Sequence, residues 1–258
     1  MNWQLVFLGS AVTACATGLG ALPALGLRYL SARANNVLMG FSAGIMLSAS
    51  SFSLIVPSLH LAADQTKTKF YGAALVGAAV LLGATFLFLC NRLIPHEHFI
   101  SGREGGPSSI QLKRIWLFVM AITLHNFPEG LAVGSGVGSQ SLSLALPIVA
   151  GIGLQDMPEG FIVAAALMSV GYTKWQSVFV AVITGVVEAI AALFGFIATS
   201  FFQPLLPWML AFAGGAMIYV VVEEMIPEIQ TKRISSDASG GLLVGFVLMM
   251  VLDVALSV

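Results

Sequence analysis

The sequence predicts an all-α polytopic membrane protein with eight transmembrane helices and both termini outside, and three observations lead to this prediction. Hydrophobic residues make up 58% of the 258 residues and charged residues only 9%, whereas a soluble domain carries roughly 25% charged residues. The apolar residues form eight continuous runs, each long enough to cross a bilayer as a helix. The basic residues gather in the loops on one side of these runs.

The same composition excludes several other classes of protein. A freely soluble enzyme cannot cover its surface with so few charges, and a disordered chain would be far less hydrophobic. The 11 basic and 12 acidic residues leave no positive footprint for nucleic acid. The two cysteines, Cys15 and Cys90, are too few for a disulfide scaffold or a cysteine-rich metal site. A Walker-type phosphate loop is absent, so we expect no nucleotide motor.

Each expected span is a continuous apolar run rather than an alternating one, which favours helices over a transmembrane barrel. The first run lacks a cationic leader and is too long for a signal-peptide core, so we expect a true helix. The second is long enough to tilt or kink near its outer end. We place the spans at about 3–27, 36–62, 70–92, 114–134, 142–168, 175–200, 205–228 and 240–257.

The basic residues predict the orientation. With the N-terminus outside, the outer loops hold only Lys67 and Lys69. The inner loops then hold Arg28, Arg33, Arg92, Arg103, Lys113, Arg114, Lys174, Lys232 and Arg233. Because cytoplasmic loops are enriched in Lys and Arg, we expect a multi-pass protein of the cell (inner) membrane with both termini extracytoplasmic.

The chain reads as one transmembrane domain over residues 1–258, interrupted by a flexible cytoplasmic loop at 93–113 that is rich in Gly, Ser and Pro. His96, Glu97 and His98 lie at the start of this loop. They are equally consistent with a solvated polar segment and with transient capture of a metal ion at an exit.

A short repeat carries the functional signal. The fourth span contains His-Asn-Phe-Pro-Glu-Gly at 125–130, and the fifth contains Gln-Asp-Met-Pro-Glu-Gly at 155–160. The sixth span adds Glu188, and no Lys or Arg lies in the middle of any span. Ionisable groups inside a bilayer are costly, so these residues are functional candidates by default.

Buried carboxylates without basic partners must be protonated, line water or bind a cation. His125 favours a cation, because His125 and Glu129 are at i and i+4 and lie on one helix face. Gln155 and Glu159 repeat this spacing. Pro128 and Pro158 lack an N–H, so each is expected to kink its helix and expose a carbonyl oxygen one turn earlier.

The donor set selects a class of metal. It contains one imidazole, amide oxygens and several carboxylates but no thiolate, which suits borderline divalent ions such as Zn, Fe(II), Mn, Co or Cd. Ca²⁺ and Mg²⁺ would need no imidazole. The residues alone do not rank the borderline metals.

The paired motifs, the eight spans and the His-containing cytoplasmic loop resemble the ZIP (Zrt/Irt-like protein) family of divalent metal transporters. The Gln-Asp pair of the second motif is similar to the bacterial GufA-like branch. The resemblance covers essentially the whole chain. It implies uptake of divalent metal into the cytoplasm, with zinc foremost and cadmium, iron, manganese or cobalt as further cargo, by an elevator-like movement in a homodimer. It implies no catalytic cofactor and no enzymatic activity.

The resemblance also implies a binuclear site between the fourth, fifth and sixth spans. The first metal would be held by His125, Gln155, Glu129 and Glu159, and the second by Asn126, Asp156 and Glu188, with Glu129 and Glu159 bridging the two. Met46 in the second span would be a weak additional ligand. Many relatives carry His where this chain has Gln155, which implies a looser first site.

Two other functions use the same residues. An intramembrane metalloenzyme would take His125 and Glu129 as ligands and Glu159 as base, but it needs an open metal position and a water path. A proton-coupled antiporter would shuttle protons on the carboxylates and bind no metal. His60 at the end of the second span and Asp253 in the last span are either interface residues or part of a pathway.

Overall fold

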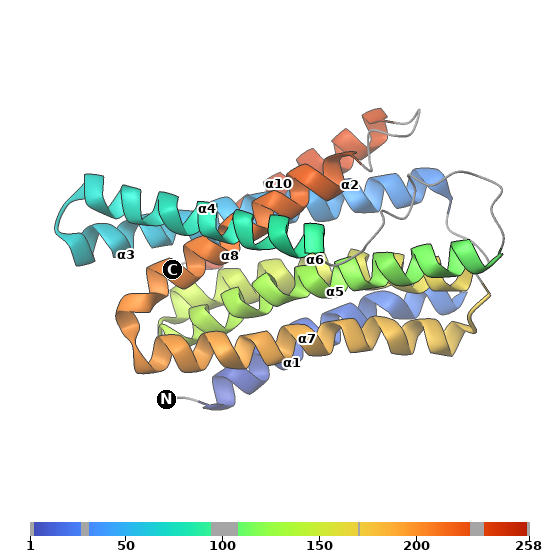
Figure 1. Cartoon of the computed structure of the whole chain (residues 1–258), viewed down its shortest axis with the longest axis horizontal. Coiled ribbons are helices and arrows are strands. Elements are labelled where there is room, and N and C mark those ends of the chain that lie inside the picture. Colours follow the sequence, from blue (N-terminus) through green and yellow to red (C-terminus); the bar gives the residue numbers. More distant parts are fainter. Residues whose placement is uncertain (1–2, 27–30, 94–107, 170, 228–234, 257–258) are drawn as a thin grey trace.

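The computed structural model describes residues 3–26, 31–93, 108–169, 171–227 and 235–256, and within these ranges the chain is built from helices (Figure 1). The helices lie roughly along the longest axis of the molecule, except that α10 crosses them obliquely. They are α1 (Trp3–Ala21), α2 (Ala32–Ser48), α3 (Val56–Thr66), α4 (Lys69–Leu93), α5 (Ser108–Gly138), α6 (Leu142–Ser169), α7 (Lys174–Phe201), α8 (Leu206–Val220) and α10 (Ser235–Leu256).

The structure confirms the all-helical membrane architecture. In the described part of the chain, seven helical stretches are long and apolar enough to cross a membrane, and they match every expected span except the fourth. At the fourth span the structure has α5, an unbroken helix of 31 residues. The total of eight spans and the outer position of the termini stay predictions.

The last residues of the loop expected at 93–113, residues 108–113, are helical in the structure. Helix α5 begins at Ser108, whereas residues 94–107, with His96, Glu97 and His98, lie outside the described residues. The flexible, cytoplasmic character of the loop stays a prediction. Ser101, Gly102, Gly105 and Gly106 have low helix propensity, and α5 begins just after them.

Two π-helical segments interrupt the long spans, and a proline follows each of them. The segment η2 (Ala49–Ile55) joins α2 to α3 and precedes Pro57, and η4 (Val221–Met225) extends α8 and precedes Pro227. Because proline lacks an N–H, a carbonyl in the preceding turn loses its usual partner and the turn widens. The second span is therefore one continuous helix from α2 through η2 to α3, in which the hydrogen bonding changes from the α to the π pattern within η2.

Glycines let the helices approach closely within two groups. The first group, called here the four-helix bundle, contains α1, α5, α6 and α7. A Cβ added at Gly130 of α5 would collide with the carbonyl oxygen of Glu188 in α7, and one at Gly160 of α6 with that of Thr17 in α1. Small residues at such crossings allow the two helix backbones to come into contact, as in other pairs of membrane helices.

The second group, called here the flanking group, contains α2, α3, α4, α8 and α10. A Cβ at Gly44 of α2 would collide with the carbonyl oxygen of Leu242 in α10, and one at Gly83 of α4 with that of Phe212 in α8. Every described glycine whose Cβ would lie within 3.0 Å of a carbonyl oxygen meets a helix of its own group.

The boundary between the groups is packed differently. Helix α2 faces α6, α8 faces α5, and α10 faces α6. At Gly151 of α6 an added Cβ would lie 2.5 Å from Cε of Met249 in α10, the end of a flexible side chain rather than backbone. The helices of the two groups are therefore held together by side chains.

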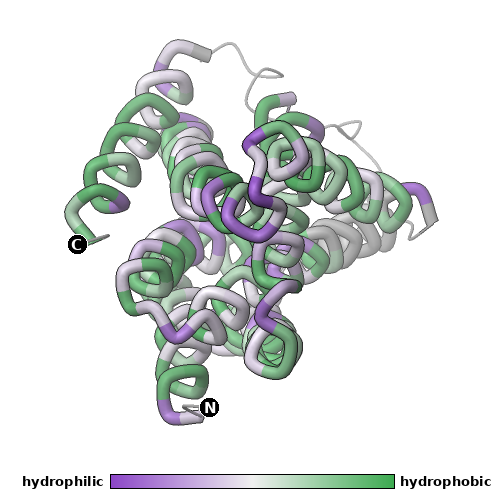
Figure 2. Tube along the Cα trace, turned by 90° about the vertical axis from the view of Figure 1, so that its left-hand side faces the viewer, coloured by the Kyte–Doolittle hydropathy of each residue, from purple (hydrophilic) through white to green (hydrophobic). Residues whose placement is uncertain are grey.

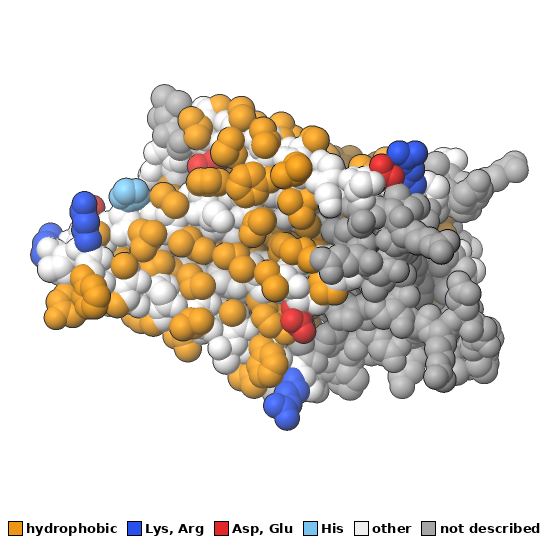
Figure 3. Space-filling view, turned by 90° about the horizontal axis from the view of Figure 1, so that it is seen from above, with side chains coloured by type: hydrophobic (Ala, Val, Ile, Leu, Met, Phe, Trp, Pro, Cys, Tyr) orange, Lys and Arg blue, Asp and Glu red, His pale blue; other side chains and the backbone are white. Residues whose placement is uncertain are grey.

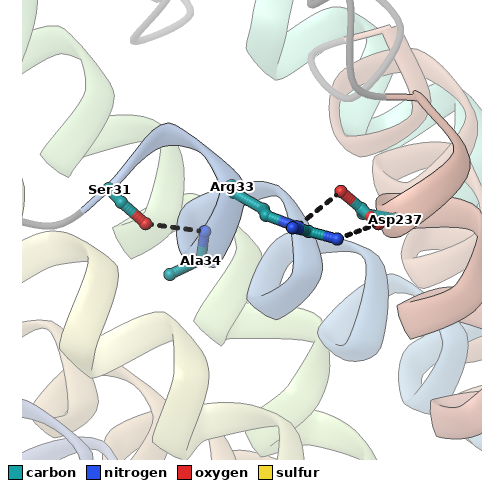
Figure 4. A network of polar contacts seen from close by, with 4 residues as sticks. All are labelled: Ser31, Arg33, Ala34 and Asp237. Atoms are coloured by element: carbon teal, nitrogen blue, oxygen red, sulfur yellow. Dashed lines mark hydrogen bonds and ion pairs between the residues drawn. The ribbon is translucent and has the colours of Figure 1, made fainter.

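An ion pair also joins the N-terminal ends of α2 and α10. Ser31 caps α2 by accepting a hydrogen bond from the Ala34 N–H at 3.2 Å, and the Arg33 guanidinium forms an ion pair with Asp237 at 2.8 Å (Figure 4).

The surface of the described residues fits a lipid environment. Hydrophobic side chains cover most of the described surface in Figure 3, and the Lys and Arg side chains lie at its edges. Figure 2 shows hydrophilic residues at the turns that face the viewer, between helices that are mostly hydrophobic along their length. Exposed residues such as Leu81 of α4, Phe179 of α7 and Val254 of α10 contribute to this apolar surface.

Candidate metal site

Three carboxylates meet inside the four-helix bundle. Glu129 comes from the middle of α5, and Asp156 and Glu159 come from the middle of α6. One oxygen of each lies within 4.8 Å of the others, and all three residues are buried. A carboxylate repels another carboxylate at this distance, so the cluster needs positive charge, whether metal ions or protons, to be stable in the bilayer.

Glu188 of α7 supplies a fourth carboxylate. Its side chain is 0% exposed, and it interacts electrostatically with Glu129, Asp156 and Glu159. Gly130 allows this approach, because the backbone of α5 touches that of α7 at Glu188 itself. Gly130, the residue after Pro128 and Glu129, therefore allows the carboxylates of Glu129 in α5 and Glu188 in α7 to lie close together.

His125 and Gln155 lie one turn before the two glutamates, as the i, i+4 spacing predicts. The His125 side chain is 5% exposed and interacts electrostatically with Glu159 of the neighbouring helix. The Gln155 amide Nε2 donates a short hydrogen bond to Oε1 of Glu129, and Oε1 of Gln155 itself has no hydrogen-bond partner. His125 of α5 thus contacts the glutamate of α6, and Gln155 of α6 contacts the glutamate of α5.

Asn126 and Asp156 follow His125 and Gln155 directly and are also buried. The Asn126 amide Nδ2 donates to the carbonyl oxygen of Thr184 in α7 at 2.9 Å, so its orientation is fixed, and its Oδ1 has no hydrogen-bond partner.

Met46 is 1% exposed on α2, in the flanking group. Its side chain belongs to the apolar core cluster that includes Ile152 of α6. Met46 lies one turn after Ser42, whose hydroxyl reaches Glu159. The structure thus places Met46 on a helix that contacts the carboxylate cluster.

The unsatisfied atoms of the cluster are hydrogen-bond acceptors. Among the described residues, oxygens without a hydrogen-bond partner are found on Glu129, Asp156, Gln155 and Asn126. The Arg33–Asp237 salt bridge lies at the end of α2 outside this cluster, whereas His125 faces the carboxylates and interacts with Glu159. Buried oxygens without donors are costly, and a set of carboxylate, amide and imidazole groups fits a borderline divalent cation.

Two contacts of the cluster were not anticipated from the sequence. The Ser42 hydroxyl donates to Oε1 of Glu159 at 3.1 Å, and the Thr184 carbonyl orients Asn126. The only sequence signal for Ser42 was its position one turn before Met46. The Thr184 contact uses a backbone oxygen, which no residue pattern marks.

The other residues singled out in the sequence lie apart from this cluster. His60 is exposed on α3, and Cys15 and Cys90 are free thiols. Asp253 of α10 is partly buried and accepts a hydrogen bond of 2.5 Å from Ser53 of η2.

Comparison with known proteins identifies relatives of this chain. Residues 96–253 match the family model described as ZIP zinc transporter. The chain is 45% identical to the zinc transporter GufA of Myxococcus xanthus, over 96% of this chain and 98% of the relative. It is 43% identical to the zinc transporter ZIPB of Bordetella bronchiseptica, over 96% and 80%. It is 30% identical to the human zinc transporter ZIP11, over 84% and 87%. The chain therefore belongs to the ZIP family of metal transporters, in its GufA-like bacterial branch, which is a family of membrane transporters and not of enzymes.

Proposed function

We propose that this ZIP transporter carries zinc, with cadmium, iron, manganese or cobalt as further cargo, into the cytoplasm through the carboxylate cluster of α5, α6 and α7. The observation that carries the proposal is the group of four buried carboxylates, Glu129, Asp156, Glu159 and Glu188, which face His125, while no Lys or Arg is among the buried described residues. A transport site in a membrane must offer charge without binding its cargo irreversibly.

Charge supports two metal ions rather than one. Four carboxylates carry four negative charges when ionised, and two divalent cations neutralise them, whereas one cation would leave a net double negative charge in the bilayer. His125, Gln155 and Met46 would complete the ligand set of one metal ion, and Asn126, Asp156 and Glu188 would complete that of the other. Glu129 and Glu159 would bridge the two ions.

The packing supports a movement of the four-helix bundle against the flanking group. Close glycine contacts to carbonyl oxygens occur within each group, whereas Met249 packs into the space beside Gly151 at the boundary. A flexible thioether adapts to a sliding neighbour more easily than interlocked backbones do. The homodimer and the outer position of both termini remain part of this proposal on the grounds of the family and the basic residues.

The test is zinc flux into proteoliposomes that contain a fluorescent zinc indicator. The wild-type protein should carry zinc inward, and Glu129→Ala should reduce the flux to the level of empty liposomes while the protein stays folded. Metal analysis of the purified protein separates transport of metal from the antiporter alternative, which requires no bound metal. Normal flux in the Glu129→Ala variant would contradict the proposed site.

A further inference from the structure

The Ser42 hydroxyl reaches across the boundary between the two groups of helices. Serines in apolar helices usually donate to a carbonyl of their own helix one turn earlier, and Ser50, Ser51 and Ser58 do so at 2.6–2.8 Å. Ser53 donates to Asp253 of α10, which lies within the flanking group. Ser42 is 0% exposed, and its Oγ lies 3.1 Å from Oε1 of Glu159 and 3.5 Å from the Gln155 carbonyl oxygen, both on α6 in the other group, so the carboxylate is the nearer acceptor.

We propose that Ser42 is a positioning residue that holds Glu159 ready for metal and releases it when the four-helix bundle moves. The proposal rests on the proposed function, in which Glu159 bridges the two ions. It assigns to Ser42 no direct bond to the metal. Its role is to restrict the orientation of a carboxylate that would otherwise turn freely within the site.

The chemistry of the contact suits this role. A carboxylate has two oxygens and about four lone-pair positions, so a hydrogen bond from Ser42 leaves room for metal ions. The hydroxyl is neutral and therefore does not cancel the charge that attracts the cation. Partners that orient metal ligands in this way typically contribute 10- to 100-fold to metal affinity.

The location of the contact makes it dependent on conformation. Ser42 and Met46 lie one turn apart on α2, in the flanking group, whereas Glu159 lies on α6 in the four-helix bundle. A displacement of α6 along α2 by even one turn, about 5.4 Å, would break the Ser42–Glu159 hydrogen bond. The site would then hold its metal less tightly, which favours release on the opposite side of the membrane.

The test compares Ser42→Ala with Ser48→Ala. Ser48 is on the same helix, is also 0% exposed, and its hydroxyl has no hydrogen-bond partner. Equilibrium zinc binding and the KM and maximal rate of zinc flux are measured for both. Ser42→Ala should weaken zinc binding about 10- to 100-fold and raise KM, with no fall in maximal rate, whereas Ser48→Ala should match the wild type.

Two further arms keep the outcome interpretable. Ser42→Gly also removes the hydroxyl and introduces no new metal ligand, so it should shift affinity in the same direction even if Ser42→Ala does not fold. Wild-type affinity and KM in both Ser42 variants, or an equal loss in Ser48→Ala, would overturn the role of Ser42. Wild-type zinc binding in Glu159→Ala would instead overturn the proposed function.

Discussion

At the scale of single residues, the spacing of each motif predicted which side chains share a helix face, whereas the meeting of the two faces was implied by the resemblance to the ZIP family. His125 with Glu129, and Gln155 with Glu159, lie one turn apart, and the structure brings an oxygen of Glu129 within 4.8 Å of oxygens of Asp156 and Glu159. The partner of Ser42 was not predictable, because Glu159 is 117 residues further along the chain and only the packing of α2 on α6 brings the two together. Local spacing fixes contacts within a helix but not between helices.

Gln155 offers a prediction about affinity. An amide oxygen is a weaker ligand for a borderline metal than an imidazole nitrogen, and the Gln155 amide already donates to Glu129. We expect Gln155→His to tighten zinc and cadmium binding roughly tenfold, equivalent to about 1.4 kcal/mol. If release limits turnover, the maximal flux should fall in proportion.

Isothermal titration and proteoliposome flux on the same preparation check this prediction. The matched control is Gln203→His, because Gln203 is exposed in the short 3₁₀ helix η3 (Gln203–Leu205) and donates to the Gly138 carbonyl, remote in sequence from either motif. Unchanged affinity in Gln155→His would place residue 155 outside the ligand set.

Glu188 offers a graded comparison with the bridging glutamates. Removing Glu188 takes a ligand from one proposed ion only, whereas removing Glu159 takes one from both. We therefore expect Glu188→Ala to retain measurable zinc flux and Glu159→Ala to lose it, with both proteins showing a wild-type melting profile. Equal loss in the two variants would argue against bridging by Glu159.

At the scale of the helices, glycine contacts decide how far apart the carboxylates lie. Gly130 and Gly160 end the two motifs, and the structure shows that they approach the carbonyl oxygens of Glu188 and Thr17. The π-helical segments were less predictable. Pro57 and Pro227 signal a disturbed turn, but a proline is equally compatible with a kink, a 3₁₀ turn or a π turn.

Gly130→Ala tests the helix contact. The added methyl group meets the backbone of α7 at Glu188, so α5 and α7 must separate, at a cost of about 1–3 kcal/mol in stability. The separation moves Glu129 away from Glu188, so we expect zinc affinity to fall as well. Binding and thermal unfolding are measured together.

Gly77→Ala is the matched control for this substitution. A Cβ at Gly77 of α4 would have no atom within 4 Å, so the same change of residue type should leave both stability and binding unaltered. Wild-type zinc binding in Gly130→Ala would show that the spacing of α5 and α7 does not set the affinity.

At the scale of the whole molecule, the chain divides into a four-helix bundle that carries the carboxylates and a flanking group that contributes Ser42 and Met46. The composition and the positions of the hydrophobic runs predicted the membrane architecture, because bilayer thickness constrains helix length. The division into two groups was not visible in the sequence. Glycines occur in nearly every span, and only the structure identifies the helix that each one contacts.

A disulfide across the boundary tests whether the groups move relative to one another. A Cβ at Gly151 would lie 3.5 Å from Cβ of Ala49, which suits a disulfide. In a chain whose native Cys15 and Cys90 are replaced, Ala49→Cys with Gly151→Cys should lose zinc flux on oxidation and regain it on reduction.

Ala16 and Gly153 provide the control pair inside the four-helix bundle. A Cβ at Gly153 would lie 3.8 Å from that of Ala16, so the same chemistry can link α1 to α6 without crossing the boundary. This second disulfide should leave flux unchanged. Wild-type zinc flux in the oxidised Ala49→Cys, Gly151→Cys protein would rule out the proposed movement.

The most direct test of the central claim is the number of zinc ions bound per chain at equilibrium. Purified wild-type protein in a lipid nanodisc should bind two zinc ions at the carboxylate cluster, because two divalent ions neutralise its four carboxylates. The double variant Glu129→Ala, Glu159→Ala should lose both while remaining folded. A wild-type chain that binds fewer than two zinc ions, or a double variant that still binds two, would contradict the account.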